Sequence, residues 1–278
     1  MDGDVRFRGE SVQAGAWPLK HVGLHIKLQE GLLSLAPFEL TLPQGKFLGT
    51  AQINARGKTP TTRIDVRIRD VQLDQFKGRK PDAKPALAGT LQGRVMLEGH
   101  GDSVHDVMAD ANGQAFFLLP HGEVRAAFAE LTGINVARGI GLLLKGDNDR
   151  AEIRCGVAGL TVKDGTLHVD QLIFDTEDVR ISGRGEIRLG PEELDLSIKG
   201  EPKKLRLVRL RTPITLSGHL KKPQVGVDAG KTLKQGAIAT ALGAIATPFA
   251  AIAAFIDPGL AKDENCAALV AGKTVAAQ

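Results

Sequence analysis

The sequence predicts a mainly β protein: an elongated, twisted antiparallel sheet of meander repeats, with a short helical segment in mid-chain and an Ala-rich helical segment near the C-terminus. Three observations predict this fold. Apolar residues alternate with polar or small ones through most of the chain, as they do in strands with one apolar face. Glycine-containing dipeptides separate these runs at turn positions. One meander pattern occurs twice, and repeated meanders need stacked neighbours to bury their apolar faces, which favours an extended sheet.

The clearest meander covers residues 155–198. Its first two alternating runs flank Asp164-Gly165, and an Asp-Gly between such runs is a strong hairpin signal because glycine takes positive φ without steric cost. Alternation resumes over residues 179–189 and 194–198, on either side of a Gly-Pro turn. This stretch is therefore expected to form consecutive antiparallel hairpins.

The same pattern occurs nearer the N-terminus. When residues 23–53 are aligned with residues 157–187 without a gap, Glu30-Gly31 falls on Asp164-Gly165. Glycines and turn dipeptides keep phase along the alignment, which favours a true repeat. Because few residues are identical, the alternative is the generic alternation that any two meanders share.

The elements divide the chain into four predicted parts: an N-terminal β-meander repeat over residues 1–76, a loop or linker over 77–86, a central β-meander over 87–229, and a helical segment with the tail over 230–278. The cleanest amphipathic strand is residues 62–73, with aliphatic residues on one face and charges on the other. The 77–86 stretch is rich in Lys, Arg and Pro, and no aromatic residue lies between its charges. We expect an exposed loop there rather than a nucleic-acid site.

Two segments lose the strand period. Near residues 123–145, inside the central meander, apolar residues follow a helical spacing that ends in a Gly-Asp-Asn-Asp stretch. Residues 236–256 carry no charge, and their length would just span a bilayer. The weak transfer energy of Ala, Gly and Thr, the interruption at Pro248 and the absence of anchoring residues favour helices packed on the sheet or lying at a lipid interface. A transmembrane helix is the alternative.

Composition argues against some functions. The 278 residues are 42% hydrophobic and 24% charged, which is ordinary for a folded protein. Aromatic residues are only 4%, so nucleic-acid binding, which relies on stacking aromatics, is not expected. A net charge of +4 with scattered basic residues gives at most a mild preference for anionic surfaces such as lipid headgroups. The acidic start is no secretory signal, and strand-like sequence directly after it suggests a fragment of a longer protein.

A polar run between two strands contains the residue types of a catalytic or metal site: His100, Asp102, Ser103, His105 and Asp106. Neither a G-x-S-x-G elbow nor an H-E-x-x-H spacing accompanies them. Flanking glycines indicate an ordinary turn, so we expect no enzyme activity, no metal and no cofactor.

Six stretches carry a family resemblance through their order and spacing. Four of them are CGVAGLTVKDG at 155–165, DTEDVRISGRGEIRLGPEELDLSIKGEPKK at 175–204, LRTPITLSGHLKKPQVGVD at 210–228 and ALGAIATPFAAIAAFIDPGLAKDENC at 241–266. Together these resemble the C-terminal region of the AsmA family. AGAWPLKHVGLHIKLQEGLLSLAPFELTLPQGKFLG at 14–49 and ALAGTLQGRVMLEGHGDSV at 86–104 are similar to the family's preceding segment. The resemblance thus covers essentially the whole chain.

The resemblance implies a periplasmic protein of the Gram-negative envelope, anchored to the inner membrane by an N-terminal helix that this chain lacks. AsmA-like proteins are related to bridge-like lipid-transfer proteins, whose sheets curl into an apolar groove, and are associated with outer-membrane assembly and lipid homeostasis. The resemblance also implies a disulfide between Cys155 and Cys266, which the sequence alone leaves open as two unrelated buried thiols. Such a disulfide and a single membrane crossing by residues 236–256 exclude each other.

The leading hypothesis is a non-catalytic lipid-binding groove, because an apolar strand face must be covered by another element or by ligand. The expected partners are a phospholipid or other envelope lipid, the inner membrane through the missing anchor, and envelope proteins. The alternative is a structural or assembly factor of the envelope that closes its apolar face with its own helices or with protein partners. The predicted groove lining consists of Leu24, Ile26, Leu28, Ile64, Val66, Ile68, Val95, Leu97, Leu167, Val169, Ile181, Ile187, Leu189, Leu194, Leu196 and Ile198.

Overall fold

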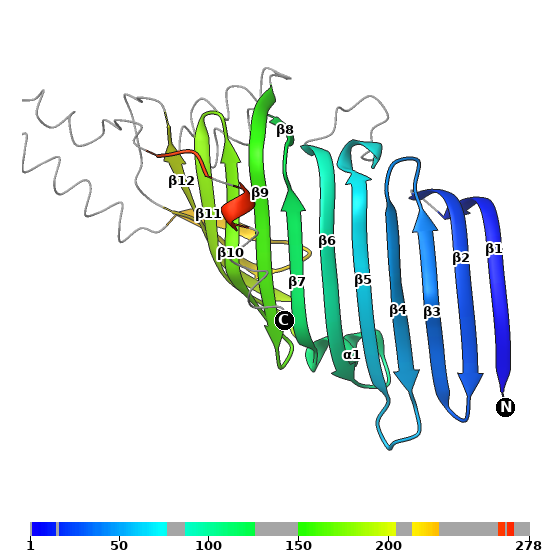
Figure 1. The fold of residues 1–278 in the computed structure, drawn as a ribbon. Helices are drawn as coiled ribbons and strands as arrows, with labels where there is room; N and C mark the ends of the chain where they lie inside the picture. The colour runs from blue at the N-terminus through cyan, green and yellow to red at the C-terminus, as the bar shows by residue number, and fades with distance from the viewer. Residues whose placement is uncertain are drawn as a thin grey trace, which may run out of the picture.

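A computed structural model describes residues 2–14, 17–76, 87–125, 150–203, 213–227, 261–264 and 266–269. These residues form one long antiparallel sheet of 14 strands, which confirms the mainly β fold (Figure 1). The strands are β1 (Gly3–Ala14), β2 (Trp17–Gln29), β3 (Leu32–Thr41), β4 (Lys46–Asn54), β5 (Thr61–Gln72), β6 (Leu87–His100), β7 (Asn112–Leu119), β8 (Gly122–Arg125), β9 (Arg150–Lys163), β10 (Thr166–Thr176), β11 (Val179–Arg188), β12 (Glu193–Pro202), β13 (Ile214–His219) and β14 (Gln224–Val227). The helical elements are η1 (Leu73–Gln75), α1 (Val104–Ala109) and a turn at residues 266–269.

The strands lie in the sheet in the order in which they occur in the chain, from β1 at one edge to β14 at the other. Figure 1 shows this succession from blue β1 to green β9. The exception is β8, which pairs with both β6 and β9 beyond the end of β7. Apart from these two pairings with β8, each strand pairs with the strands before and after it in this order, as expected for a meander.

The register confirms the repeat that the sequence alignment predicts. In the first unit, β2–β4, Leu33 lies opposite both Leu28 and Ile53. In the second unit, β9–β11, Leu167 takes the equivalent place opposite Val162 and Ile187. Both units then shift register at the same aligned points, between Leu24 and Ile26 in the first unit and between the corresponding β9–β10 pairs in the second. Shared bulges are not a consequence of alternation alone, so the two meanders are one repeated structure.

The hairpin turn between the first two strands of each unit also matches. Glu30 and Gly31 have φ values of +47° and +81°, and Asp164 and Gly165 have +47° and +69°. Two successive residues with positive φ form the type I′ turn, whose twist matches that of the flanking strands. Glycine at the second position of each turn takes this conformation without the cost that a Cβ imposes.

The first residues of the predicted mid-chain helical segment form a strand, so the prediction is wrong there. The helical insert was expected from residue 123, but Gly122–Arg125 is strand β8, with Val124 opposite Leu87 and Ala151. Backbone pairing on both sides outweighs the helical spacing of so short a stretch.

The rest of the predicted insert, the predicted linker at 77–86 and the uncharged run at 236–256 lie outside the described residues. In the part of the chain that the structure describes, no helix is long and apolar enough to cross a membrane. The division into domains stays a prediction.

Complete burial is concentrated where β9 meets its neighbours. Along β9, Ala151, Ile153, Cys155 and Val157 are buried, so every second side chain of this stretch is removed from water. Asp175 and Thr176 of β10 are also fully buried. By contrast, β1 and β14 expose apolar side chains such as Phe7 and Val225. The described residues therefore have their largest buried cluster around β9, with further buried residues at Leu42 and Val71.

Candidate functional site

One face of the sheet is apolar from β1 to β13. Residues directly opposite each other in antiparallel strands point to the same face, so successive pairs trace a row across the sheet. Starting at Val5, the pairs lead through Ile64 near the middle to Leu194, and no position is polar. The full row is Val5, Ile26, Leu35, Ala51, Ile64, Leu97, Gly113, Val162, Leu167, Ile187, Leu194 and Gly218. At one strand spacing per step, the row is roughly 50 Å long. We call the side of the sheet that carries it the apolar face.

The structure brings the predicted lining residues together on this face. The predicted residues in β2, β5, β6, β10, β11 and β12 lie in this row or in parallel rows; for example, Val66 lies opposite Gly49 and Val95. Leu189 differs, because it follows the end of β11, where its N–H donates to the carbonyl of Gly165. The sequence argument missed Phe7 and Phe38, which both lie opposite Leu24 on the same face. Their alternation with polar neighbours was the available signal. That these side chains contact lipid stays a prediction.

The apolar face is only partly removed from water. All sixteen predicted lining residues are half-buried: none is classed as buried and none as fully exposed. Val5 and Phe7 on the edge strand are 55% and 47% exposed, and Ile53 is 39% exposed. Exposed apolar surface costs about 25 cal/mol per Å². A contiguous patch of this kind on a soluble protein indicates a binding surface.

The opposite face, which we call the polar face, carries charges in paired arrangements. Arg63 of β5 lies opposite Glu98 of β6, and their side chains form an ion pair at 2.8 Å. Arg94 donates two hydrogen bonds, of 3.0 and 2.7 Å, to the carboxylate of Asp65. The hydrogen bond from Arg94 lowers the pKa of Asp65, and the one from Arg63 lowers the pKa of Glu98. The two faces of the same strands thus differ in polarity, as the alternation of apolar and charged residues predicts.

A disulfide joins the C-terminal segment to the sheet. Cys155 of β9 and Cys266 are bonded, with 5.5 Å between their Cα atoms, which confirms the predicted pair. Cys155 lies opposite Asp175, and Val157, next along the same side of β9, lies opposite Leu118. Both side chains belong to the polar face. Residues 261–269 are therefore attached to the face opposite the predicted lining.

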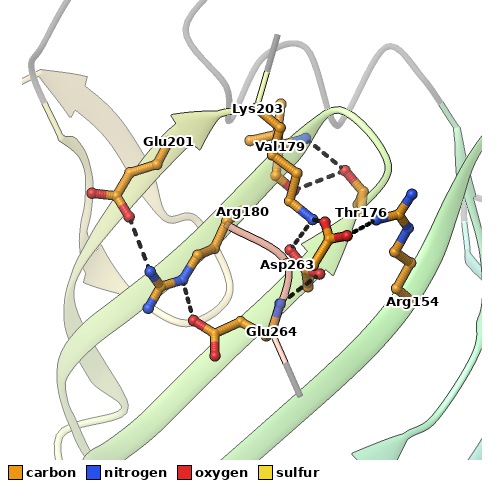
Figure 2. A network of polar contacts seen from close by, with 9 residues as sticks. Arg154, Thr176, Val179, Arg180, Glu201, Lys203, Asp263 and Glu264 are labelled. Atoms are coloured by element: carbon orange, nitrogen blue, oxygen red, sulfur yellow. Dashed lines mark hydrogen bonds and ion pairs between the residues drawn. The ribbon is translucent and has the colours of Figure 1, made fainter. Parts of the chain in front are cut away.

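Next to this disulfide in the sequence and the sheet, an ionic network joins residues 263 and 264 to the strands (Figure 2). The carboxylate of Asp175 lies 2.6 Å from the ammonium of Lys203 and accepts a 3.2 Å hydrogen bond from the N–H of Glu264. Lys203 also contacts Asp263 at 2.6 Å, and its hydrogen bond is the main cause of the lowered pKa of Asp263. Arg180 pairs with Glu264 at 2.6 Å.

Arg154 adds a further ion pair with Asp263. We call residues 261–269, with the disulfide and these contacts, the clasp. A buried carboxylate such as Asp175 requires hydrogen bonds and an opposite charge, and the clasp supplies part of both.

The polar run that contains catalytic residue types is a helix cap. The hydroxyl of Ser103 accepts a 3.1 Å hydrogen bond from the N–H of Asp106 at the start of α1. His100 contacts Asp110 at 2.7 Å, and these side chains are exposed. This geometry stabilises a helix N-terminus and needs no chemistry. Among the described residues, no three His, Cys, Asp or Glu side chains are grouped as metal ligands.

Comparison with known proteins identifies the family. The profile of the AsmA family matches residues 1–210. The chain belongs to the AsmA family. It is 32% identical over 269 residues to the protein named AsmA family protein YhjG of Escherichia coli (strain K12), an alignment that covers 96% of this chain and 39% of that relative.

The chain therefore spans about two fifths of the length of this curated relative. No solved structure matches. Membership of the AsmA family suggests a function associated with the cell envelope, and neither the family description nor the relative's name mentions an enzymatic activity.

Proposed function

We propose that this part of an AsmA family protein binds the acyl chains of envelope lipids along its apolar face. In this proposal the protein is periplasmic and non-catalytic. Lipid moves across successive strands between the inner and outer membranes, in support of outer-membrane assembly and lipid homeostasis. The proposal requires a surface that is apolar, continuous and accessible.

The observation that carries the proposal is the unbroken apolar row, most of whose residues are half-buried. A row about 50 Å long at strand spacing matches a chain-like ligand better than a compact one. Each methylene removed from water gains about 0.8 kcal/mol. Aliphatic side chains hold such a ligand without fixing its position, so the same contacts form as it slides from strand to strand.

The position of the clasp also supports the proposal. Residues 261–269 are attached to the polar face, so the described C-terminal residues do not compete with a ligand for the apolar face. An envelope assembly factor that closes its apolar face against its own helices or against protein partners remains the rival, and the experiment must separate the two.

The test places charge on the apolar face and compares it with the same charge on the polar face. Val66 and Val95 lie opposite each other at mid-sheet, and Val66→Asp/Val95→Asp puts two carboxylates in the path of the ligand. Gln52→Asp/Gln114→Asp adds the same charge at exposed positions of the polar face. Native mass spectrometry of the purified proteins, with analysis of their organic extracts, measures bound phospholipid.

We expect lipid with the original chain and with Gln52→Asp/Gln114→Asp, and about tenfold less with Val66→Asp/Val95→Asp, because an unpaired charge in an apolar site is costly. Circular dichroism of each variant establishes that it is folded. Lipid-free preparations of the original chain that remain stable monomers would support the rival, as would equal lipid content in both variants.

A further inference from the structure

An open hollow of about 470 Å³ lies on the polar face over β5, β6 and β7. Three arginines, Arg67, Arg69 and Arg94, line it together with Phe116 and Leu118. This volume is within the range of small-molecule sites, which combine apolar walls with a few polar groups. The hollow is on the face opposite the proposed lipid site, so the inference drawn from it does not depend on that function.

Like charges face each other at this hollow. Arg67 lies directly opposite Arg94, and Arg69 lies directly opposite Lys46 on the other side. Like charges directly opposite in a sheet are destabilising. The ion pair with Asp65 offsets part of the charge of Arg94, and Glu39 pairs with Lys46 at 3.2 Å.

Arg67 and Arg69 are compensated less directly: the carboxylate of Asp65, which is paired with Arg94, attracts Arg67 only through space. Within the described ranges, no carboxylate forms an ion pair with either guanidinium. The carboxylate of Asp70, which also lines the hollow, accepts a 2.7 Å hydrogen bond from the side-chain amide of Gln92. Among the described residues, the sheet thus holds two guanidinium groups without an ion-pair partner, two residues apart on one strand face, next to two apolar side chains and the carboxylate of Asp70.

A second hollow on the same face provides the contrast. It measures about 430 Å³ and is lined by Arg63, Asp65 and Glu98 among others. Its arginine is paired with Glu98, and Asp65 is paired with Arg94. These two neighbouring hollows of similar size therefore differ in charge pairing, and the first also has Phe116 and Leu118 as apolar walls.

We propose that the first hollow binds the phosphate group of an amphiphilic phosphate ester. Two guanidinium groups match the oxygens of a phosphate and form strong, directional hydrogen bonds with it. Phe116 and Leu118 contact the apolar part of the same molecule. Such a ligand offsets the repulsion between Arg67 and Arg94. The phosphate is carried by a lipid headgroup or by a soluble ester, and the experiment distinguishes these two sources.

Hexyl phosphate is the primary probe, with inorganic phosphate and hexanol as its two halves. Calorimetric titration at low salt is expected to detect hexyl phosphate binding that is stronger than that of either half. In Arg67→Gln/Arg69→Gln the affinity is expected to fall at least about tenfold, in line with the strength of charge-assisted hydrogen bonds. Arg8→Gln/Arg184→Gln removes the same charge from exposed positions elsewhere on the polar face and should bind like the original chain.

The melting temperature provides a second measurement. Because Arg67→Gln/Arg69→Gln removes two like-charge pairs, its melting temperature should equal or exceed that of the original chain while binding is lost. Phe116→Ser should reduce hexyl phosphate affinity to that of inorganic phosphate. These two results together distinguish a binding site from a general loss of structure.

Vesicle flotation separates the two sources of the phosphate. Binding to vesicles that contain phosphatidylglycerol, and its loss in Arg67→Gln/Arg69→Gln, would identify a lipid headgroup. Hexyl phosphate binding without vesicle binding would identify a soluble ester. Absence of hexyl phosphate binding, or equal affinity in the original chain and Arg67→Gln/Arg69→Gln, would overturn the proposal.

Discussion

The two copies of the repeat share a backbone and differ in what their polar faces hold. Under the alignment that superposes β2–β4 on β9–β11, His21 and Thr41 correspond to Cys155 and Asp175. Each pair occupies the same cross-strand register position. His21 and Thr41 are half-buried, whereas Cys155 and Asp175 are fully buried beneath the clasp. The comparison teaches that apolar alternation and turns fix the register, while polar-face residues remain free to acquire a separate role.

We expect the largest effect when the disulfide, which is the covalent part of this difference, is removed. Cys155→Ser/Cys266→Ser opens a link across 111 residues, and chain-entropy arguments give about 4–5 kcal/mol for a loop of that size. Hydrogen exchange should increase around β9 and β10 and stay unchanged in β2–β4, which the link does not enclose. Dithiothreitol should reproduce this change in the original chain. Unchanged exchange at β9 would contradict a stabilising role for the clasp.

We expect the second largest effect when equivalent residues are exchanged between the two copies of the repeat. Asp175→Thr places the first-copy residue in the second copy and leaves Lys203, which is 7% exposed, with Asp263 as its ion-pair partner among the described residues. Disrupting a buried ion pair costs about 3 kcal/mol or more, so we expect unfolding free energy to fall by about 3 kcal/mol.

The reverse exchange, Thr41→Asp, is the control for Asp175→Thr. It should change the free energy of unfolding by less than about 1 kcal/mol, because this position is partly exposed. Urea denaturation measures both variants, and equal losses would contradict the comparison.

The matching turns give a smaller and more local contrast. A Cβ on Gly31 would meet no atom closer than 3.5 Å, whereas on Gly165 it would lie 2.0 Å from the carbonyl oxygen of Ala109. Both glycines have positive φ, so Gly31→Ala should cost about 1–2 kcal/mol from conformation alone. Gly165→Ala should cost about twice as much, because the backbone after α1 must also move. Equal costs in urea denaturation would show that the packing of the second turn contributes nothing.

The smallest expected effect is a pH dependence of the clasp. Contacts with Lys203 and Arg154 lower the pKa of Asp263 below its ordinary value of 3.8. A carboxyl whose pKa is lowered by folding stabilises the folded state above its unfolded value, and that contribution is lost as the pH falls through its folded value.

The clasp's dependence on Asp263 can be measured where the disulfide is absent. In Cys155→Ser/Cys266→Ser, adding Asp263→Asn should reduce hydrogen-exchange protection of residues 261–269 at neutral pH. The difference should disappear below the folded pKa of Asp263, because the carboxyl is then uncharged with or without the substitution. A difference that persists at all pH values would mean that Asp263 acts through packing instead of charge.

Local pattern was sufficient to predict the sheet. Alternation around Asp164-Gly165 specified strands, a hairpin and an apolar face, and the gapless alignment even anticipated a shared register. These features depend on residues close together in the chain, where period and turn chemistry act directly. The start of the predicted helical insert failed for the same reason, since Gly122–Arg125 is strand only through pairing with β6 and β9.

Long-range polar contacts could not be predicted from the periodicity of the sequence. Lys203 meets Asp263 across 60 residues and Glu264 meets Asp175 across 89, and neither spacing has a periodic signal. The disulfide was accessible only through family resemblance. Likewise, the juxtaposition of Arg67 and Arg94 depends on the β5–β6 register, which the alternation of each strand does not specify.

The agreement between strand order and chain order has a consequence for synthesis. Each strand from β2 to β14 pairs with a strand that precedes it in the chain, so one pairing partner has always been made before it. The sheet can therefore lengthen one hairpin at a time during translation, with little waiting for distant segments. Cys155 can be joined to Cys266 only after residue 266 has been made, so this oxidation occurs on a chain whose second repeat is already complete.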